Sequence, residues 1–177
     1  MLKSSLLLVL VAFSMHVFAM DAPVKNEEGD IQKKIMAPQF SNSQSNGILL
    51  ISLNILVIDD NKVNLAVMEK MLKELGCENI TLVENAEAAV GLIKDKAEKN
   101  TYFNMIFTDI NMPEMDGIDC AREIRKVPHM ESVPIIAVTT EEKIEEKCLA
   151  SGINALMSKP FTKLHLSEVL TKAFLNQ

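Results

Sequence analysis

From about residue 53 onward, apolar positions follow two alternating patterns along the chain. Short runs rich in branched residues, such as "NILVI" at 54–58, are typical of strands covered on both faces. Longer stretches follow in which apolar residues recur at helical spacing, as Leu65, Met68 and Leu72 do before Gly76. The predicted strands are residues 54–58, 79–83, 102–108, 134–138 and 153–158. The predicted helices are residues 61–76, 85–100, 116–126, 141–152 and 163–175.

This regular alternation with short connections predicts an α/β fold, in which a doubly wound five-stranded parallel sheet carries five helices on its two faces. Asn85 and Asp116 are placed to cap the second and third helices. We place the folded domain at residues 53–176. In such sheets, sites form outside the carboxyl ends of the strands.

Two segments precede the folded domain. Residues 1–20 carry a lysine and then a continuous apolar run, which is typical of a signal peptide. The run is short for a spanning helix, so an uncleaved membrane anchor is the second interpretation. Translation from Met20 or Met36 is the third. Residues 21–50 are polar and lack periodicity, which predicts a flexible spacer.

Composition excludes several classes of protein. A net charge of −6 and a pI near 5.1 argue against direct binding to nucleic acid. Cys77, Cys120 and Cys148 form no CxxC and have no paired histidines nearby, so we expect buried thiols rather than zinc ligands or disulfides. P-loop, dinucleotide, zinc-protease and serine-hydrolase motifs do not occur.

Polar side chains follow four of the predicted strands. Asp59 and Asp60 come after the first strand, Asp109 after the third, Thr139 after the fourth and Lys159 after the fifth. The carboxyl ends of parallel strands share one edge of the sheet, so we expect these side chains to converge.

Three converging carboxylates repel each other unless a cation compensates them. Mg²⁺ prefers oxygen ligands and keeps open positions for phosphate oxygens. Asp59, Asp60 and Asp109, with the backbone carbonyl of Asn111, would form such an incomplete shell. Lys159 and the Thr139 hydroxyl could then bind phosphoryl oxygens. Because a carboxylate can accept a phosphoryl group as an acyl phosphate, Asp109 is a candidate acceptor.

Each residue also has a plainer interpretation. Asp60 or Asn61 could simply cap the first helix. Thr139 could cap the fourth helix in a capping box with Glu142. Lys159 could be a solvated surface lysine. The occurrence of all of them after four strands of one sheet favours a common site.

The stretches "ILVIDDN", "FTDINMPEMDG", "IIAVTT" and "MSKPF" occur in this order, and from residue 54 onward the chain resembles the response-regulator receiver domain of two-component signalling. The resemblance implies a flavodoxin-like sheet of order 2-1-3-4-5. It also implies a Mg²⁺ cofactor and a Lys159–Pro160 peptide that is often cis.

Residue by residue, the resemblance implies that Asp109 is the phospho-acceptor. Asp60 would bind Mg²⁺ directly, Asp59 largely through water, and Asn111 through its backbone carbonyl. The same resemblance makes Thr139 and Lys159 the switch hydroxyl and the phosphate-binding lysine.

Two positions depart from the family pattern. Leu156 stands where an aromatic residue usually reports the phosphorylated state, which puts the usual threonine–aromatic switch in doubt. Thr140 stands where a small alanine is common and could crowd the site.

We therefore predict a cytoplasmic phosphorelay receiver, phosphorylated by a histidine kinase or a histidine-phosphotransfer protein. It would signal through protein contacts without a fused output domain. Val63, Ala66 and Val67 could form the docking surface for the partner, or they could simply widen the buried face of the first helix.

Two other classes remain open. The first is a Mg²⁺-dependent phosphatase-type enzyme with an aspartyl nucleophile. Such enzymes usually carry a second aspartate two residues later as an acid/base, and Asn111 occupies that position. The second is a degenerate receiver that acts only as a binding module. We expect no enzymatic activity beyond self-catalysed phosphorylation and dephosphorylation.

Overall fold

Five short parallel strands form the centre of the computed structural model, which describes residues 50–141 and 143–175. The sheet has the order β2-β1-β3-β4-β5, as the resemblance implied. The strands are β1 Asn54–Ile58, β2 Asn79–Val83, β3 Met105–Asp109, β4 Ile135–Thr139 and β5 Ala155–Ser158. The predicted doubly wound α/β fold is confirmed.

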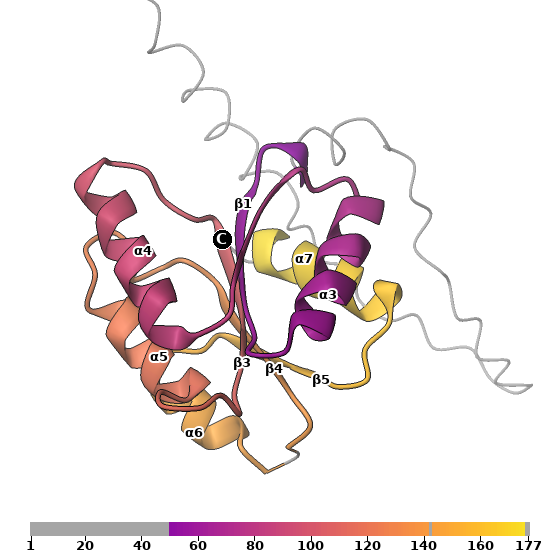
Figure 1. Cartoon of the computed structure of the whole chain (residues 1–177). Helices are drawn as coiled ribbons and strands as arrows, with labels where there is room; N and C mark the ends of the chain where they lie inside the picture. Colours follow the sequence, from indigo (N-terminus) through magenta and orange to yellow (C-terminus); the bar gives the residue numbers. More distant parts are fainter. Residues whose placement is uncertain (1–49, 142, 176–177) are drawn as a thin grey trace, which may run out of the picture. The chain divides into compact units, whose positions relative to one another are not determined.

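Helices cover both faces of this sheet (Figure 1). One face carries α3 and α7, and the other carries α4, α5 and α6. The helices are α3 Lys62–Glu74, α4 Ala86–Glu98, α5 Gly117–Arg125, α6 Glu145–Ala150 and α7 Lys163–Leu175. Alternate residues of each central strand enter the two apolar cores, as Leu56 and Val57 do on β1.

The helix starts follow local capping chemistry. Asn61, Asn85 and Asp116 each accept a hydrogen bond from a backbone amide in the first turn of α3, α4 and α5. The predicted caps Asn85 and Asp116 are confirmed. Asn61 rather than Asp60 caps α3, so Asp60 is free for another role.

Several predicted boundaries differ from the structure by one to four residues. α6 begins at Glu145 rather than at residue 141, and its N-cap residue, Ile144, makes no side-chain cap bond. β3 and β5 begin two or three residues later than predicted. Asn104 and Asn154, which precede them, accept bonds through their side chains from the first amides of the neighbouring strands, at 2.8 Å each.

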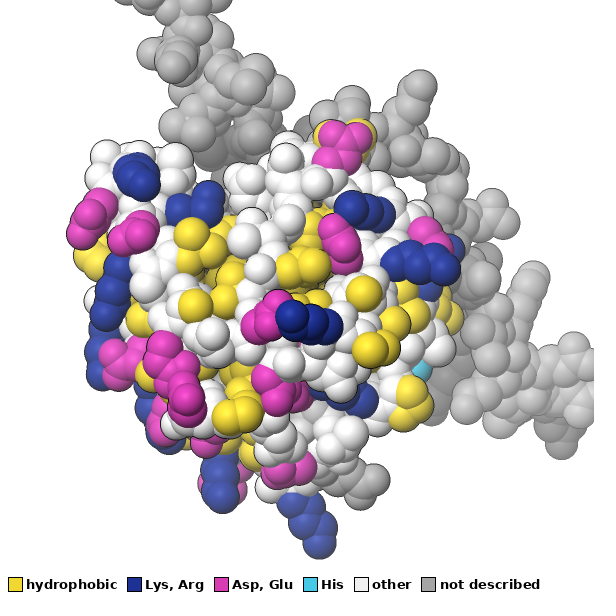
Figure 2. Space-filling view, viewed as in Figure 1, with side chains coloured by type: hydrophobic (Ala, Val, Ile, Leu, Met, Phe, Trp, Pro, Cys, Tyr) yellow, Lys and Arg dark blue, Asp and Glu magenta, His cyan; other side chains and the backbone are white. Residues whose placement is uncertain are grey.

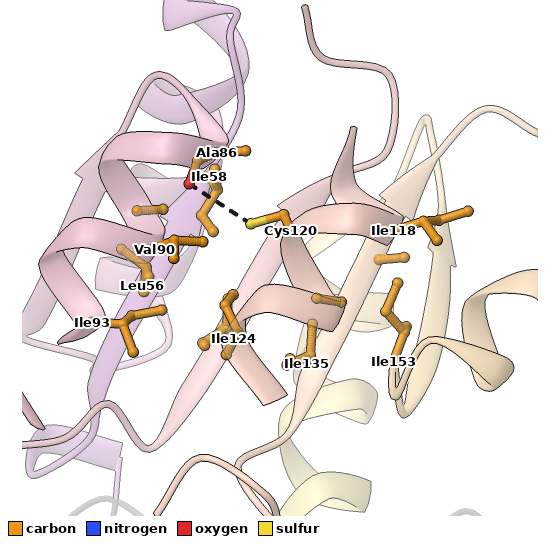
Figure 3. Close-up of a cluster of buried hydrophobic side chains, with 14 of the residues drawn as sticks. Leu56, Ile58, Ala86, Val90, Ile93, Ile118, Cys120, Ile124, Ile135 and Ile153 are labelled. Carbon is orange, nitrogen blue, oxygen red and sulfur yellow. Dashed lines mark hydrogen bonds between the residues drawn. The ribbon is translucent and has the colours of Figure 1, made fainter. Parts of the chain in front are cut away.

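The three cysteines are buried and unpaired with one another, as predicted. Figure 3 shows Cys120 inside the core between α4 and α5, with its sulfur 4.0 Å from the carbonyl oxygen of Ala86. Burial raises the pKa of the Cys77 thiol to about 11 and that of Cys120 to about 12, which leaves both as unreactive thiols.

The predicted segment 1–20 and nearly all of the predicted spacer 21–50 lie outside the described residues. Leu50, at the end of that spacer, is half-buried against the core formed with α3 and α7. Within residues 50–141 and 143–175, no helix has the length and apolar character needed to cross a bilayer.

Arg125, at the end of α5, links the connection from α5 to β4 with the connection from α6 to β5. Both connections lie at the edge of the sheet opposite the carboxyl ends of the strands. Its guanidinium donates to the carbonyl oxygens of Met130, Val133 and Gly152 and to the side-chain oxygen of Asn154. A planar group with several fixed donors can satisfy these directions together, whereas an ammonium cannot.

We expect Arg125→Lys to lower the free energy of unfolding by about 1–3 kcal/mol, because part-buried carbonyl acceptors lose their donors. Urea unfolding followed by circular dichroism measures this loss. Arg122→Lys is the matched control, since Arg122 is on the same helix but exposed, in a surface ion pair with Asp119. Equal losses of unfolding free energy in the two variants would contradict this role of the Arg125 guanidinium.

Candidate functional site

The carboxyl end of β1 places two aspartates side by side. Asp59 is buried and Asp60 is exposed. The Asp59 carboxylate accepts the Asn61 backbone amide at 2.9 Å and the Asn64 side-chain amide at 3.0 and 3.1 Å. The turn into α3 therefore fixes the orientation of Asp59.

Asp109 is the last residue of β3, and only 8% of it is exposed. The connection to α5 folds back against it, since the Gly117 amide donates to the Ile110 carbonyl oxygen at 2.9 Å. A Cβ atom at Gly117 would lie 2.1 Å from the Asp109 carbonyl oxygen. A glycine is therefore required where the "MDG" turn passes the strand end.

Lys159 follows β5, and its backbone amide donates to the Thr139 carbonyl oxygen at 2.8 Å. Its ammonium nitrogen lies 2.9 Å from Asp59 Oδ2 and 3.0 Å from Asp109 Oδ1. The Lys159 side chain is 18% exposed, so the interpretation as a solvated surface lysine is wrong. The Lys159–Pro160 peptide is cis, as the resemblance implied.

The two buried carboxylates and the one ammonium determine the electrostatics of the site. Burial raises the pKa of the Asp109 carboxyl above its usual value, and Lys159 offsets this only in part. Burial alone would lower the pKa of Lys159, but its hydrogen bonds to Asp59 and Asp109 outweigh burial and raise it. The site therefore has a firmly protonated lysine and a carboxylate that gains from an added cation.

Asp59, Asp60 and Asp109 each offer a carboxylate oxygen, and the three atoms lie within 4.8 Å of one another. Three hard oxygen donors at this spacing suit Mg²⁺, which takes a few carboxylates and keeps water or phosphate at its other positions. Asn111 is exposed in the connection after Asp109, and the metal role of its carbonyl remains a prediction.

Thr139 is the buried last residue of β4, and its hydroxyl accepts the Glu141 backbone amide at 3.1 Å. It does not cap α6, which starts at Glu145, so the capping interpretation was wrong. Thr140 is exposed and lines the cavity at the site. Leu156 is half-buried and packs against the core beneath α4, α5 and α6.

A cavity of about 320 Å³ opens beside the carboxylates, on the face of the sheet that carries α3 and α7. Its polar rim includes Asp59, Asp109 and Lys159, and its apolar wall includes Met68 and Phe161. The sequence reasoning missed Asn64, which also lines this cavity. Its position in the first turn of α3, directly after the acidic pair, was the available signal.

The comparison with protein families agrees with this geometry. The family model described as response regulator receiver domain matches residues 55–171. The chain belongs to this family of two-component signalling domains.

Relatives include both a large histidine kinase and a small chemotaxis protein. The osmosensing histidine protein kinase SLN1 of Saccharomyces cerevisiae is 33% identical over 155 residues, which are 86% of this chain and 12% of the kinase. The chemotaxis protein CheY-3 of Vibrio cholerae is 32% identical over 129 residues, which are 72% of this chain and 95% of that protein. The chain therefore spans a small part of the large kinase but nearly the whole length of the small chemotaxis protein.

Solved structures of receivers are also similar. The receiver domain of sensor histidine kinase PA1611 from Pseudomonas aeruginosa, with magnesium in its active site cleft, is 34% identical with a TM-score of 0.60 and covers 68% of this chain and 95% of its own. The receiver of histidine kinase CKI1 from Arabidopsis thaliana, complexed with Mg²⁺ and BeF₃⁻, is 29% identical with a TM-score of 0.62 and covers 73% and 94%. Similar receivers thus bind Mg²⁺, and this chain has an aspartate cluster that could hold it.

We expect Lys159→Met to lower the free energy of unfolding by about 1–3 kcal/mol at neutral pH without metal, because two buried carboxylates lose their shared cation. A group whose folded pKa is raised, as for Asp109, contributes stability below its unfolded pKa and loses it as pH rises through the folded pKa. Lys159 lowers the pKa of Asp109, so its removal raises that pKa further. The stability lost by the variant should therefore grow from acidic to neutral pH.

Urea unfolding across this pH range, with and without Mg²⁺, measures the effect. Added Mg²⁺ should restore part of the lost stability by neutralising the same carboxylates. A deficit that is independent of both pH and Mg²⁺ would contradict this account of the site.

Proposed function

We propose that the chain is the phospho-acceptor receiver of a phosphorelay, in which Asp109 accepts a phosphoryl group from a phosphohistidine. The donor would be a histidine kinase or a histidine-phosphotransfer protein. The observation that supports this most directly is the Lys159 ammonium, which lies within hydrogen-bonding distance of both Asp59 and Asp109. Charge neutralisation and positioning are the main demands of phosphoryl transfer.

In the proposed reaction, an Asp109 carboxylate oxygen attacks phosphorus, and the phosphorus–nitrogen bond of the phosphohistidine breaks. The electron pair of that bond remains on the departing imidazole nitrogen. Asp109 Oδ1 faces Lys159, so Oδ2 is the oxygen proposed to attack. Lys159 and the Thr139 hydroxyl would then bind the transferred phosphoryl oxygens.

Mg²⁺, when bound, supplies positive charge that offsets the repulsion between the phosphoryl oxygens and the carboxylates. Asp59, Asp60, Asp109 and the carbonyl of Asn111 would hold it. The exposed position of Asp60 favours it as the direct ligand, whereas Asp59 already accepts several hydrogen bonds. A hydrolytic enzyme is less well supported, since position 111 carries an amide and not a second acid.

The first test is labelling of the 177-residue chain by acetyl phosphate and Mg²⁺, followed by intact mass spectrometry. We expect one acid-stable, base-labile phosphoryl group on the wild type, none on Asp109→Asn, and none when the metal is chelated. Equal labelling of Asp109→Asn, or absence of label on the wild type, would refute the proposal. Rapid multiple turnover of phosphate esters would favour the enzyme instead.

The partner would dock on α3, beside the site. Val63 and Val67 are 69% and 42% exposed, and Ala66 is also exposed, so these residues do not widen the buried face. Hydrophobic side chains reach the surface over this helix (Figure 2). An exposed apolar strip next to a reactive carboxylate suits a helical partner that carries the phosphohistidine.

We also propose a cytoplasmic location, where kinases and ATP are found.

We expect Val63→Glu to slow phosphoryl transfer from a phosphorylated histidine-phosphotransfer protein of the same organism by about tenfold or more, because a charge enters an apolar contact at a position outside the cavity of the site. Labelling by acetyl phosphate, which needs no docking, should stay unchanged. Lys94→Glu is the control, since Lys94 is exposed on α4, across the sheet. Equal transfer rates in the two variants would contradict docking on α3.

A further inference from the structure

Asn64 lies on α3, the helix proposed to bind the partner, and its side chain faces the carboxylates of the site. Its side-chain amide donates to both oxygens of Asp59, at 3.0 and 3.1 Å. Among the described residues it has no other hydrogen-bond acceptor. The residue is half-buried and lines the cavity beside Asp109 and Lys159.

Helix formation does not explain this asparagine. Asn61 already caps α3, and Asn64 is the third residue of the helix, where asparagine is a weaker helix former than leucine. Its amide instead reaches back over the turn to the end of β1. The hydrogen bonds therefore serve the orientation of Asp59 rather than the start of the helix.

The other side chain that holds Asp59 has a divided role. Lys159 is shared between Asp59 and Asp109, and under the proposed function it also binds the transferred phosphoryl group. Asn64 is uncharged, so it orients the carboxylate without competing with a cation for the site. It can thus keep Asp59 in place while Lys159 changes partner.

We infer that Asn64 is a positioning residue that holds Asp59 for Mg²⁺ binding and so supports phosphorylation of Asp109. The inference rests on the proposed function. Groups that orient metal-binding carboxylates through hydrogen bonds commonly change metal affinity by about 10- to 100-fold when they are removed. Removal of the Asn64 amide should therefore weaken Mg²⁺ binding, and this loss of affinity should not be a consequence of a less stable fold.

The decisive variant is Asn64→Leu in the 177-residue chain. Leucine keeps a similar volume and favours the helix, so a purely structural role of the two hydrogen bonds predicts a lower melting temperature with unchanged Mg²⁺ affinity. A positioning role predicts a Kd for Mg²⁺ that rises about tenfold or more, measured by calorimetric titration without a phosphoryl donor. Lys70→Leu, at an exposed position on the same helix, should leave the Kd unchanged.

Labelling by acetyl phosphate then separates affinity from chemistry. Asn64→Leu should be labelled slowly at limiting Mg²⁺ and should approach the wild-type rate at saturating Mg²⁺. Asn64→Ala provides the same test if leucine disturbs the fold. An unchanged Kd in a folded variant would overturn the inference, whereas an unlabelled wild type that still binds Mg²⁺ would overturn only the proposed acceptor function.

Discussion

The repulsion between two buried carboxylates, Asp59 and Asp109, is the constraint that organises this molecule. The two groups come from neighbouring parallel strands, β1 and β3, and each is buried at the same edge of the sheet. Lys159 relieves the repulsion by donating to both from the end of β5. The compensating charge comes from the end of the edge strand β5. The three side chains therefore meet only when the strand order is β2-β1-β3-β4-β5.

The same constraint explains why the surroundings are built so tightly. Gly117 lets the connection after β3 pass against the Asp109 backbone, and the Lys159 amide is tied to the end of β4. Asn64 adds an uncharged restraint on Asp59 from α3. A pair of carboxylates held in this way loses little conformational freedom when a cation binds, which is the physical basis of preorganisation.

Membership of the receiver family and the similar receivers solved with Mg²⁺ agree with this chemistry. The relatives place such receivers both inside large histidine kinases and in small chemotaxis proteins. The residues of the site therefore indicate the chemistry of the domain, but not the size or architecture of the protein in which the domain occurs. Leu156 packs against the core beneath α4, α5 and α6, at the position where the resemblance implies an aromatic residue.

The sequence by itself determined the fold class, the alternation of strands and helices, and the polar residues at four strand ends. These features depend on local periodicity and on the rule that parallel strands share an edge. It could not determine where α6 begins, because the Thr139 hydroxyl accepts an amide in the preceding connection instead of capping the helix. Only the tertiary structure decided that Lys159 is shielded between two carboxylates, that Val63 and Val67 face outward, and that Asn64 orients Asp59. Each of these depends on contacts or on burial that the spacing of residues along the chain does not specify.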